Sequence, residues 1–435
     1  MSGGRTGSAT GFGGFVARAA AAGDLVVQPR MGMSDPGAMR AGLLATRRAA
    51  AATVGTITLD SYTRTGEIAA ARRAVAEGVG LNGYPIVSHG PEVTRTVLSG
   101  IADAGFPVQV RHGSARPEAI FSALLAAGLD ATEGGPVSYC LPYSRAPLHE
   151  AVASWERCCE LLAAARDTGR EPHLETFGGC MMGQLCPPSL LVAISVLEGL
   201  FFRQHGLRSI SLSYAQQANL RQDEDAVAAL TRIAGELLPD IDWHVVVYAY
   251  MGVYPQSPGG AQLLLDEAAR LSVRTGAARL IVKTTAEAHR IPTVGENVRA
   301  LETAAAVAAE ERRGAAYARV PDSGVYEEAR LLVEAVLELD TDVGRALVRA
   351  FAKGYLDVPY CLHPDNAGRS RSRLDDRGRL HWAGAGSMPI AGLVEKGRAP
   401  MLRSAELLGA LNYVQRTFDQ RAFESPVGAA TAVPR

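Results

Sequence analysis

Long uninterrupted apolar runs and an excess of one charge are both missing from this sequence. The two longest uncharged stretches, 176–197 and 243–265, are broken by prolines and glycines, so neither predicts a membrane span. Lysine and arginine number 44 against 45 acidic residues, for a net charge of -1. No overall field would therefore draw the protein to nucleic acid or to an anionic membrane. No secretory apolar stretch lies between Arg5 and Arg18, and we expect a cytoplasmic protein.

Signatures of several common chemistries are also absent. The six cysteines show no CxxC spacing, and in a chain of this size we expect them to be reduced, mostly buried thiols. The sequence has no HxH or HExxH pair for a hydrolytic metal site, no GxSxG elbow and no P-loop. Metallohydrolases, serine hydrolases and P-loop enzymes are thereby disfavoured.

The hydrophobic pattern predicts an α/β protein. From Asp24 onward, short Val/Ile/Leu-rich runs alternate with longer stretches of helical period, which is typical of repeated βα units around a parallel sheet. We predict a (β/α)8 TIM barrel over 24–315, an N-terminal tail over 1–23, and a C-terminal helical and irregular extension over 316–435. A doubly wound open sheet is the alternative fold, but no Gly-rich phosphate loop follows the first strand.

The expected strands number one more than a barrel needs, so either one run is an extra strand or turn outside the barrel or one short run is wrongly assigned. They are 25–28, 54–59, 84–87, 108–110, 131–134, 173–177, 209–212, 245–250 and 280–283. Helices are expected in the extension over 325–338 and 341–352.

Polar residues follow these apolar runs, where a TIM barrel carries its active site. Arg30, Arg64 and Arg111 follow three of them, and guanidinium groups suit bidentate binding of carboxylate or phosphate. One such arginine would more often be a surface residue, but three at one mouth favour an anionic ligand. Glu133, followed by two glycines that would let a ligand approach the backbone, is a candidate for contact with an ammonium group or for a base. These residues predict a small ligand with two anionic ends.

Ten short segments, taken in order along most of the chain, resemble the epsilon subunit of glutamate mutase, also called methylaspartate mutase. They are QPRMG (28–32), LDSYTR (59–64), LNGYPIVSHG (81–90), VQVRHG (108–113), EGGPVSYCLPYSR (133–145), ETFG (175–178), CPPS (186–189), IVKTTAEAHRIPT (281–293), DVPY (357–360) and NAG (366–368). Each is weak alone, and their shared order carries the resemblance. The chain departs from the family pattern at 114–117, 179–182 and 214–219.

The resemblance implies an isomerase, a coenzyme B12-dependent radical mutase that interconverts L-glutamate and (2S,3S)-3-methylaspartate. It implies that Arg64, Arg111 and Glu133 act on the substrate, with both arginines as carboxylate clamps. The other implied substrate residues are Arg30, His112, Tyr139 and Tyr143. Residues assigned to the adenosylcobalamin side are Arg30, Asn82, Phe177, Lys283 and Glu287, the last two near the adenosine.

The cobalt ligand is expected from a smaller partner subunit that carries a DxHxxG motif. The nearest match here begins at Asp242 but has Val247 in place of the glycine, and His244 is predicted to be a core or rim histidine. We further expect a homodimer of this chain within a hetero-oligomer. Two alternatives remain open, a B12-dependent mutase of a related amino acid and a non-catalytic relative that binds a dicarboxylate or scaffolds the small subunit. The intact site residues argue against the second.

Overall fold

The computed structural model describes residues 10–178, 185–314, 323–394 and 404–424. At its centre is an eight-stranded sheet. All its pairings are parallel, in the order β1-β8-β7-β6-β5-β4-β3-β2. A parallel bridge between Val27 and Thr53 brings the two ends of this order together. The strands are β1 (Val26–Gln28), β2 (Gly55–Thr58), β3 (Val108–Arg111), β4 (Ala131–Glu133), β5 (His173–Glu175), β6 (Ser209–Ala215), β7 (Asp242–Tyr248) and β8 (Arg279–Ile281). The predicted (β/α)8 barrel is confirmed.

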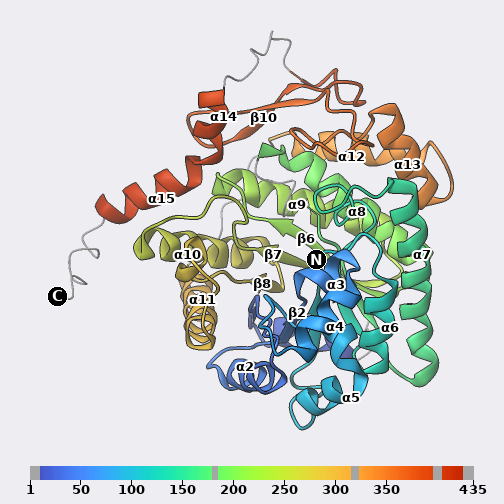
Figure 1. Ribbon diagram of the computed structural model, residues 1–435. Helices are drawn as coiled ribbons and strands as arrows, with labels where there is room; N and C mark the ends of the chain where they lie inside the picture. The colour runs from blue at the N-terminus through green and yellow to red at the C-terminus, as the bar shows by residue number, and fades with distance from the viewer. Residues whose placement is uncertain (1–9, 179–184, 315–322, 395–403, 425–435) are drawn as a thin grey trace.

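Helices follow the strands and surround the sheet (Figure 1). Asp35 begins the first of them by accepting a hydrogen bond from the Ala38 amide at 2.7 Å, and Pro36 has the fixed φ that suits the first helical position. The barrel helices are α2 (Pro36–Arg48), α5 (Ile86–Leu98), α6 (Glu118–Ala126), α7 (Leu148–Ala163), α8 (Pro188–Gln204), α9 (Leu220–Leu237), α10 (Pro258–Thr275) and α11 (Val294–Gly314). Shorter helices are α3 (Ser61–Thr65), α4 (Ile68–Ala76), η1 (Ala164–Thr168) and η3 (Thr285–Ala288). Among the described helices none is long and apolar enough to cross a bilayer.

The ninth predicted strand, over 84–87, is wrong. Tyr84 makes only an isolated parallel bridge to Leu59, and helix α5 begins at Ile86. Pro85 precedes that helix with φ of -83°, a value the proline ring imposes and a helix start tolerates. A run of four apolar residues has too few positions for its period to separate strand from helix.

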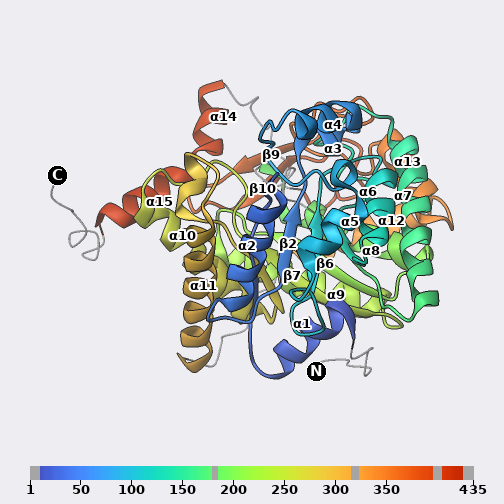
Figure 2. The same cartoon turned by 60° about the horizontal axis from the view of Figure 1, so that its bottom comes forward.

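Helix α1 (Gly11–Ala21), within the segment predicted as a tail, covers the N-terminal end of the barrel. Its buried residues Phe12 and Val16 face the strands, and the Phe12 ring stacks on His173 with centroids 5.0 Å apart. Figure 2 shows α1 at the bottom and α3 and α4 at the opposite end. One end of the barrel is thereby covered, and the C-terminal ends of the strands face the other.

The barrel interior is polar, although branched apolar side chains dominate most TIM barrels. Arg279 and Glu175 form a fully buried ion pair, and Arg279 also donates to Ser211 at 3.0 Å. Gln28 donates to Gln109 at 2.8 Å. Burying charges is tolerable only when they are paired in this way. His244, predicted to be a core or rim histidine, is partly buried, and its ring stacks on His173 at 5.2 Å.

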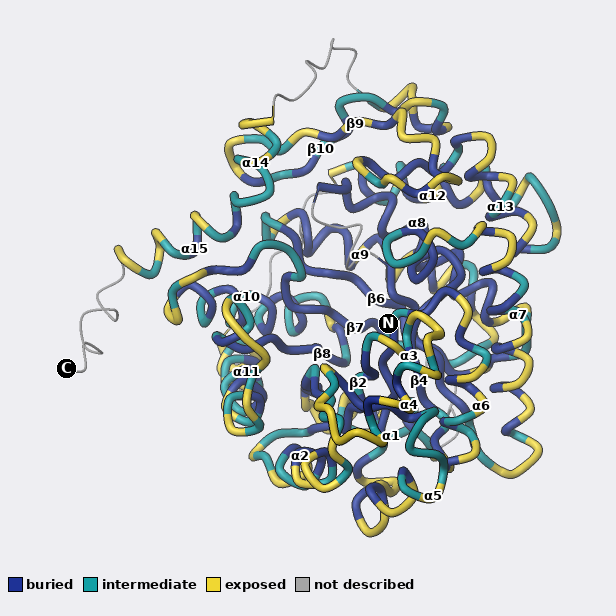
Figure 3. Tube along the Cα trace, in the orientation of Figure 1, coloured by how far each residue is buried: buried dark blue, intermediate teal, exposed yellow. Residues whose placement is uncertain are grey.

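The extension contains the two predicted helices, α12 (Val325–Leu337) and α13 (Val343–Lys353). They pack on the outside of α8 and α7. Beyond them lie an antiparallel pair, β9 (Arg371–Leu374) and β10 (Leu380–Gly384), and two more helices, α14 (Ser404–Leu411) and α15 (Tyr413–Glu424). Val414 and Phe418 attach α15 to the barrel beside Tyr254 and Leu264. Figure 3 shows that α14 has no buried turn, in contrast to the buried strands.

Gly32 provides a test of how tightly the first two strands approach. A Cβ atom at this position would overlap the carbonyl of Thr58, whose amide in turn donates to Met31 at 2.9 Å. Gly32→Ala should therefore separate the two segments and lower the free energy of unfolding by about 1–3 kcal/mol, measured by urea denaturation. Gly80→Ala, where a Cβ meets nothing within 4 Å, is the control. Equal unfolding midpoints for both variants would contradict this account.

Candidate active site

An ion pair between neighbouring strands lies at the centre of the barrel mouth. Arg111 ends β3, Glu133 ends β4, and the Arg111 Nη2 atom lies 2.8 Å from Glu133 Oε2. Both side chains are at most 5% exposed. Burial raises the pKa of Glu133, and Arg111 opposes that shift. Burial likewise works against the charge of Arg111, but Glu133 and its neighbours keep the pKa of Arg111 well above its usual value.

Two tyrosines hold Glu133 from opposite directions. The Tyr139 hydroxyl donates to Glu133 Oε1, and the Tyr248 hydroxyl lies 2.9 Å from Oε2. Tyr248 also places its ring 5.0 Å from the guanidinium of Arg111. Phe177 packs on both tyrosines, at 4.7 Å from Tyr139 and 5.4 Å from Tyr248, and Tyr143 stands edge-on to Tyr139 at 5.6 Å. We call Tyr139, Tyr143, Phe177 and Tyr248 the aromatic wall.

A buried carboxylate of α8 fixes the loop that carries two members of this wall. Glu198 accepts hydrogen bonds from the Val137 amide at 3.0 Å and from the Ser138 amide and hydroxyl at 2.9 Å each. Burial raises the pKa of Glu198 to about 7, although these hydrogen bonds act in the opposite direction.

The two glycines after Glu133 make room for protein side chains. A Cβ at Gly135 would overlap the Glu198 carboxylate, and one at Gly134 would overlap Tyr139 and come within 2.6 Å of Trp155. Close packing of protein side chains is thus enough to require glycine at both positions.

Arg64 reaches the mouth from helix α3. Asp60 caps this helix by accepting from the Thr63 amide at 3.0 Å, and Arg64 donates to Ser61 at 3.3 Å. Asn82 also binds Ser61, accepting from its amide at 2.9 Å and donating to its hydroxyl at 2.6 Å. Asn82 is thus held against the start of helix α3, beside Arg64.

His112 links Arg64 to Arg111. Burial, together with the charges of Arg64 and Arg111, lowers the pKa of His112 to about 3, so the imidazole is neutral at physiological pH. Its Nδ1 accepts from the Ser114 amide at 3.1 Å, which leaves the hydrogen on Nε2. The ring also stacks on Trp155 with centroids 5.8 Å apart. His112 is therefore a rigid neutral group between two cations.

Two guanidinium nitrogens at this mouth have no hydrogen-bond partner in the described part of the chain. Within the described residues, neither Nη1 of Arg111 nor Nε of Arg64 has a hydrogen bond, although both atoms are buried. A buried donor without an acceptor costs about 1–3 kcal/mol, so a bound anion would recover that free energy. The mouth is therefore electrostatically suited to a carboxylate.

A second group of predicted residues meets at the junction of β1 and β8. Glu287 Oε2 lies 3.1 Å from Arg30 Nη1 and 3.9 Å from Lys283 Nζ. Glu287 is held in a capping box at the start of η3, where its other oxygen accepts from the Thr284 amide at 3.0 Å. The Lys283 ammonium lies 4.1 Å from the ring centre of Tyr254. This rim cluster, Arg30, Lys283 and Glu287, has one more positive than negative charge.

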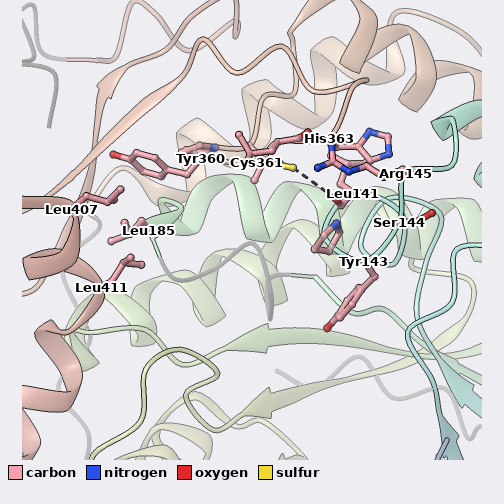
Figure 4. A pocket seen from close by; sticks show the side chains of 14 residues that line it. Leu141, Tyr143, Ser144, Arg145, Leu185, Tyr360, Cys361, His363, Leu407 and Leu411 are labelled. Carbon is pink, nitrogen blue, oxygen red and sulfur yellow. Dashed lines mark hydrogen bonds between the residues drawn. The ribbon is translucent and has the colours of Figure 1, made fainter. Parts of the chain in front are cut away.

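A pocket of about 510 Å³ lies between Tyr143 of the aromatic wall and the C-terminal extension. Figure 4 shows Tyr143 on the side nearest the strands and Tyr360 and Cys361 across from it. Leu185, Leu407 and Leu411 complete an apolar end. The cavity thus meets the aromatic wall at Tyr143, and the Arg111–Glu133 pair on the inner side of that wall is closely packed.

Tyr248, Trp155 and Arg279 were not among the site residues predicted from the sequence. Tyr248 ends the apolar run of β7 and Trp155 lies on the buried face of α7, so both patterns indicate ordinary core residues. Their closeness to Glu133 and His112 arises only when the barrel closes.

The chain was also compared with proteins of known family. Residues 8–404 match the family model of the methylaspartate mutase E chain. The glutamate mutase epsilon subunit of Halobacterium salinarum is 34% identical over 77% of this chain and 71% of its own length. That of Desulfitobacterium hafniense is 31% identical, over 77% and 72%. The mouth arginines, Glu133, the aromatic wall and the rim cluster all lie inside the range that matches the family model, and this chain belongs to the methylaspartate mutase E chain family.

Proposed function

We propose that this chain is the barrel subunit of a coenzyme B12-dependent glutamate mutase, which interconverts L-glutamate and (2S,3S)-3-methylaspartate. One observation carries the proposal. Arg111 and Glu133 form a buried pair at the mouth, and a nitrogen of Arg111 and one of Arg64 have no acceptor among the residues that the structure describes. The names of the relatives support the same assignment.

The charges at the mouth match both kinds of group in an amino dicarboxylate. The open nitrogens of Arg64 and Arg111 come from different elements and would each bind a carboxylate oxygen. Glu133 Oε2 contacts Arg111 and Tyr248, whereas Oε1 contacts Tyr139. Because each carboxylate oxygen accepts about two hydrogen bonds, Oε1 keeps one position for an ammonium hydrogen.

The rim cluster fits the adenosine part of the implied cofactor. A carboxylate fixed by two cations and a backbone amide, as Glu287 is, makes a good acceptor for the hydroxyl groups of a ribose. Arg30 and Lys283 would hold that acceptor in place. When bound, adenosylcobalamin supplies the carbon radical that starts the rearrangement.

The aromatic wall has a protective role in such a reaction. Reactive carbon radicals must be kept from water and from stray hydrogen donors, which closely packed rings exclude. Tyr139, Phe177 and Tyr248 are buried and mutually packed around Glu133. The wall and the arginines together would hold the substrate in one orientation.

The proposed function predicts that the purified chain is inactive alone, because its sequence has no DxHxxG motif to bind cobalt. Mixed with a small subunit that carries this motif and with adenosylcobalamin, it should convert glutamate to 3-methylaspartate, followed by NMR. A small subunit whose motif histidine is replaced by alanine is the control. Turnover by the chain alone would refute the need for a partner, and no turnover by the full mixture would refute the proposed function.

A further inference from the structure

Tyr248 connects the mouth to the charged interior of the barrel. It ends β7 and is fully buried, and its hydroxyl approaches two carboxylates, Glu133 Oε2 at 2.9 Å and Glu175 Oε1. Glu175 in turn is ion-paired with Arg279, and the ring of Tyr248 supports the guanidinium of Arg111. Tyr248 thus contacts three members, Glu175, Arg111 and Glu133, of a row of charges that begins at Arg279 in the interior.

The Tyr248 hydroxyl can donate to Glu133 or to Glu175 without leaving the other carboxylate unpaired. A phenol has one hydrogen and can donate it to only one carboxylate at a time. Each carboxylate has an arginine of its own, Arg111 for Glu133 and Arg279 for Glu175, so neither is left unpaired when the phenol serves the other. When the hydroxyl donates its hydrogen to Glu133, it holds Oε2 of that carboxylate toward the interior.

We propose that Tyr248 is a positioning residue for recognition of the substrate ammonium group. By anchoring Oε2 of Glu133 it keeps Oε1 turned toward the ligand, where Tyr139 leaves one acceptor position open. The inference rests on the proposed function, because it assigns the amine of an amino dicarboxylate to Glu133. It makes Tyr248 a determinant of specificity for dicarboxylates that carry an amine.

The test compares glutamate with glutarate, which has both carboxylates but no amine. Calorimetric titration would use the full chain with its small subunit and cyanocobalamin, which has no adenosyl group to start the reaction. Tyr248→Phe removes the hydroxyl and keeps the ring beside Arg111. Loss of one hydrogen bond to a charged group should weaken glutamate binding about ten-fold and leave glutarate binding within about two-fold.

Tyr214→Phe is the matched control. Tyr214 is equally buried, lies on the neighbouring strand β6, and donates to a different carboxylate, Asp223, at 2.7 Å. It should keep the wild-type preference for glutamate over glutarate.

The outcomes separate the two proposals. An unchanged preference in Tyr248→Phe, or an equal loss or complete absence of binding for both ligands, would overturn the role of Tyr248 alone. Failure of the wild-type protein to bind either ligand would overturn the proposed function and this inference with it.

Discussion

Arg111→Lys should lower the apparent affinity for glutamate about ten- to a hundred-fold, the range for loss of one hydrogen bond to a charged group of about 1.5–3 kcal/mol. Lysine keeps the positive charge but lacks the planar fork that can bind Glu133 through one nitrogen and a substrate carboxylate through another. The lysine ammonium would also lose the contact that the planar guanidinium makes with the ring of Tyr248. The measurement is the KM and kcat for glutamate in the reconstituted enzyme.

Arg64→Lys should have the smaller effect of the two. Arg64 is half-buried, its one protein hydrogen bond is to Ser61 at 3.3 Å, and no carboxylate is paired with it within the described residues. If both arginines position one substrate molecule, the variant with Arg64→Lys and Arg111→Lys together should lose less apparent affinity for glutamate than the product of the two single fold-losses.

The surface arginine Arg116, which is 61% exposed and paired with Glu150, supplies the control. Arg116→Lys should be indistinguishable from wild type, because exposed ion pairs contribute little. Wild-type kinetics in both Arg64→Lys and Arg111→Lys would rule out the dicarboxylate assignment.

The fold was predictable because it depends on local patterns. The alternation of apolar runs and amphipathic stretches indicated the barrel, and the polar residues after the runs indicated Arg111 and Glu133. The extra strand at 84–87 failed because a run of four residues has no usable period and Pro85 leads into a helix instead.

The interior charges were not predictable for a different reason. Arg279 begins β8 and precedes an apolar run, a position where an arginine usually faces solvent. Which way its side chain points depends on the register of β8 against β1 and β7, and that register is a property of the closed barrel. The same holds for Tyr248, whose partner Glu133 lies 115 positions earlier in the chain. Long-range pairing of this kind leaves no local signal.

The interior ion pair leads to the largest expected effect on stability. Glu175→Ala would leave Arg279 fully buried without its carboxylate, at a cost of about 3–5 kcal/mol in the free energy of unfolding. Burial alone would raise the pKa of Glu175, but Arg279 and Arg111 outweigh it and lower that pKa, so the ion pair persists at neutral pH. Urea denaturation at pH 7 would measure the loss.

A double variant separates the ion pair from the space it fills. Glu175→Leu with Arg279→Met replaces both charges by apolar groups of similar length, and its cost should be clearly smaller than the sum of the two single costs, because neither charge remains buried alone. Glu334→Ala, which breaks an exposed pair with Arg330, should cost less than about 1 kcal/mol and serves as the control. Additive losses in the double variant would mean that the two side chains act through packing, and the row of charges leading to Tyr248 and Glu133 would then have no energetic basis.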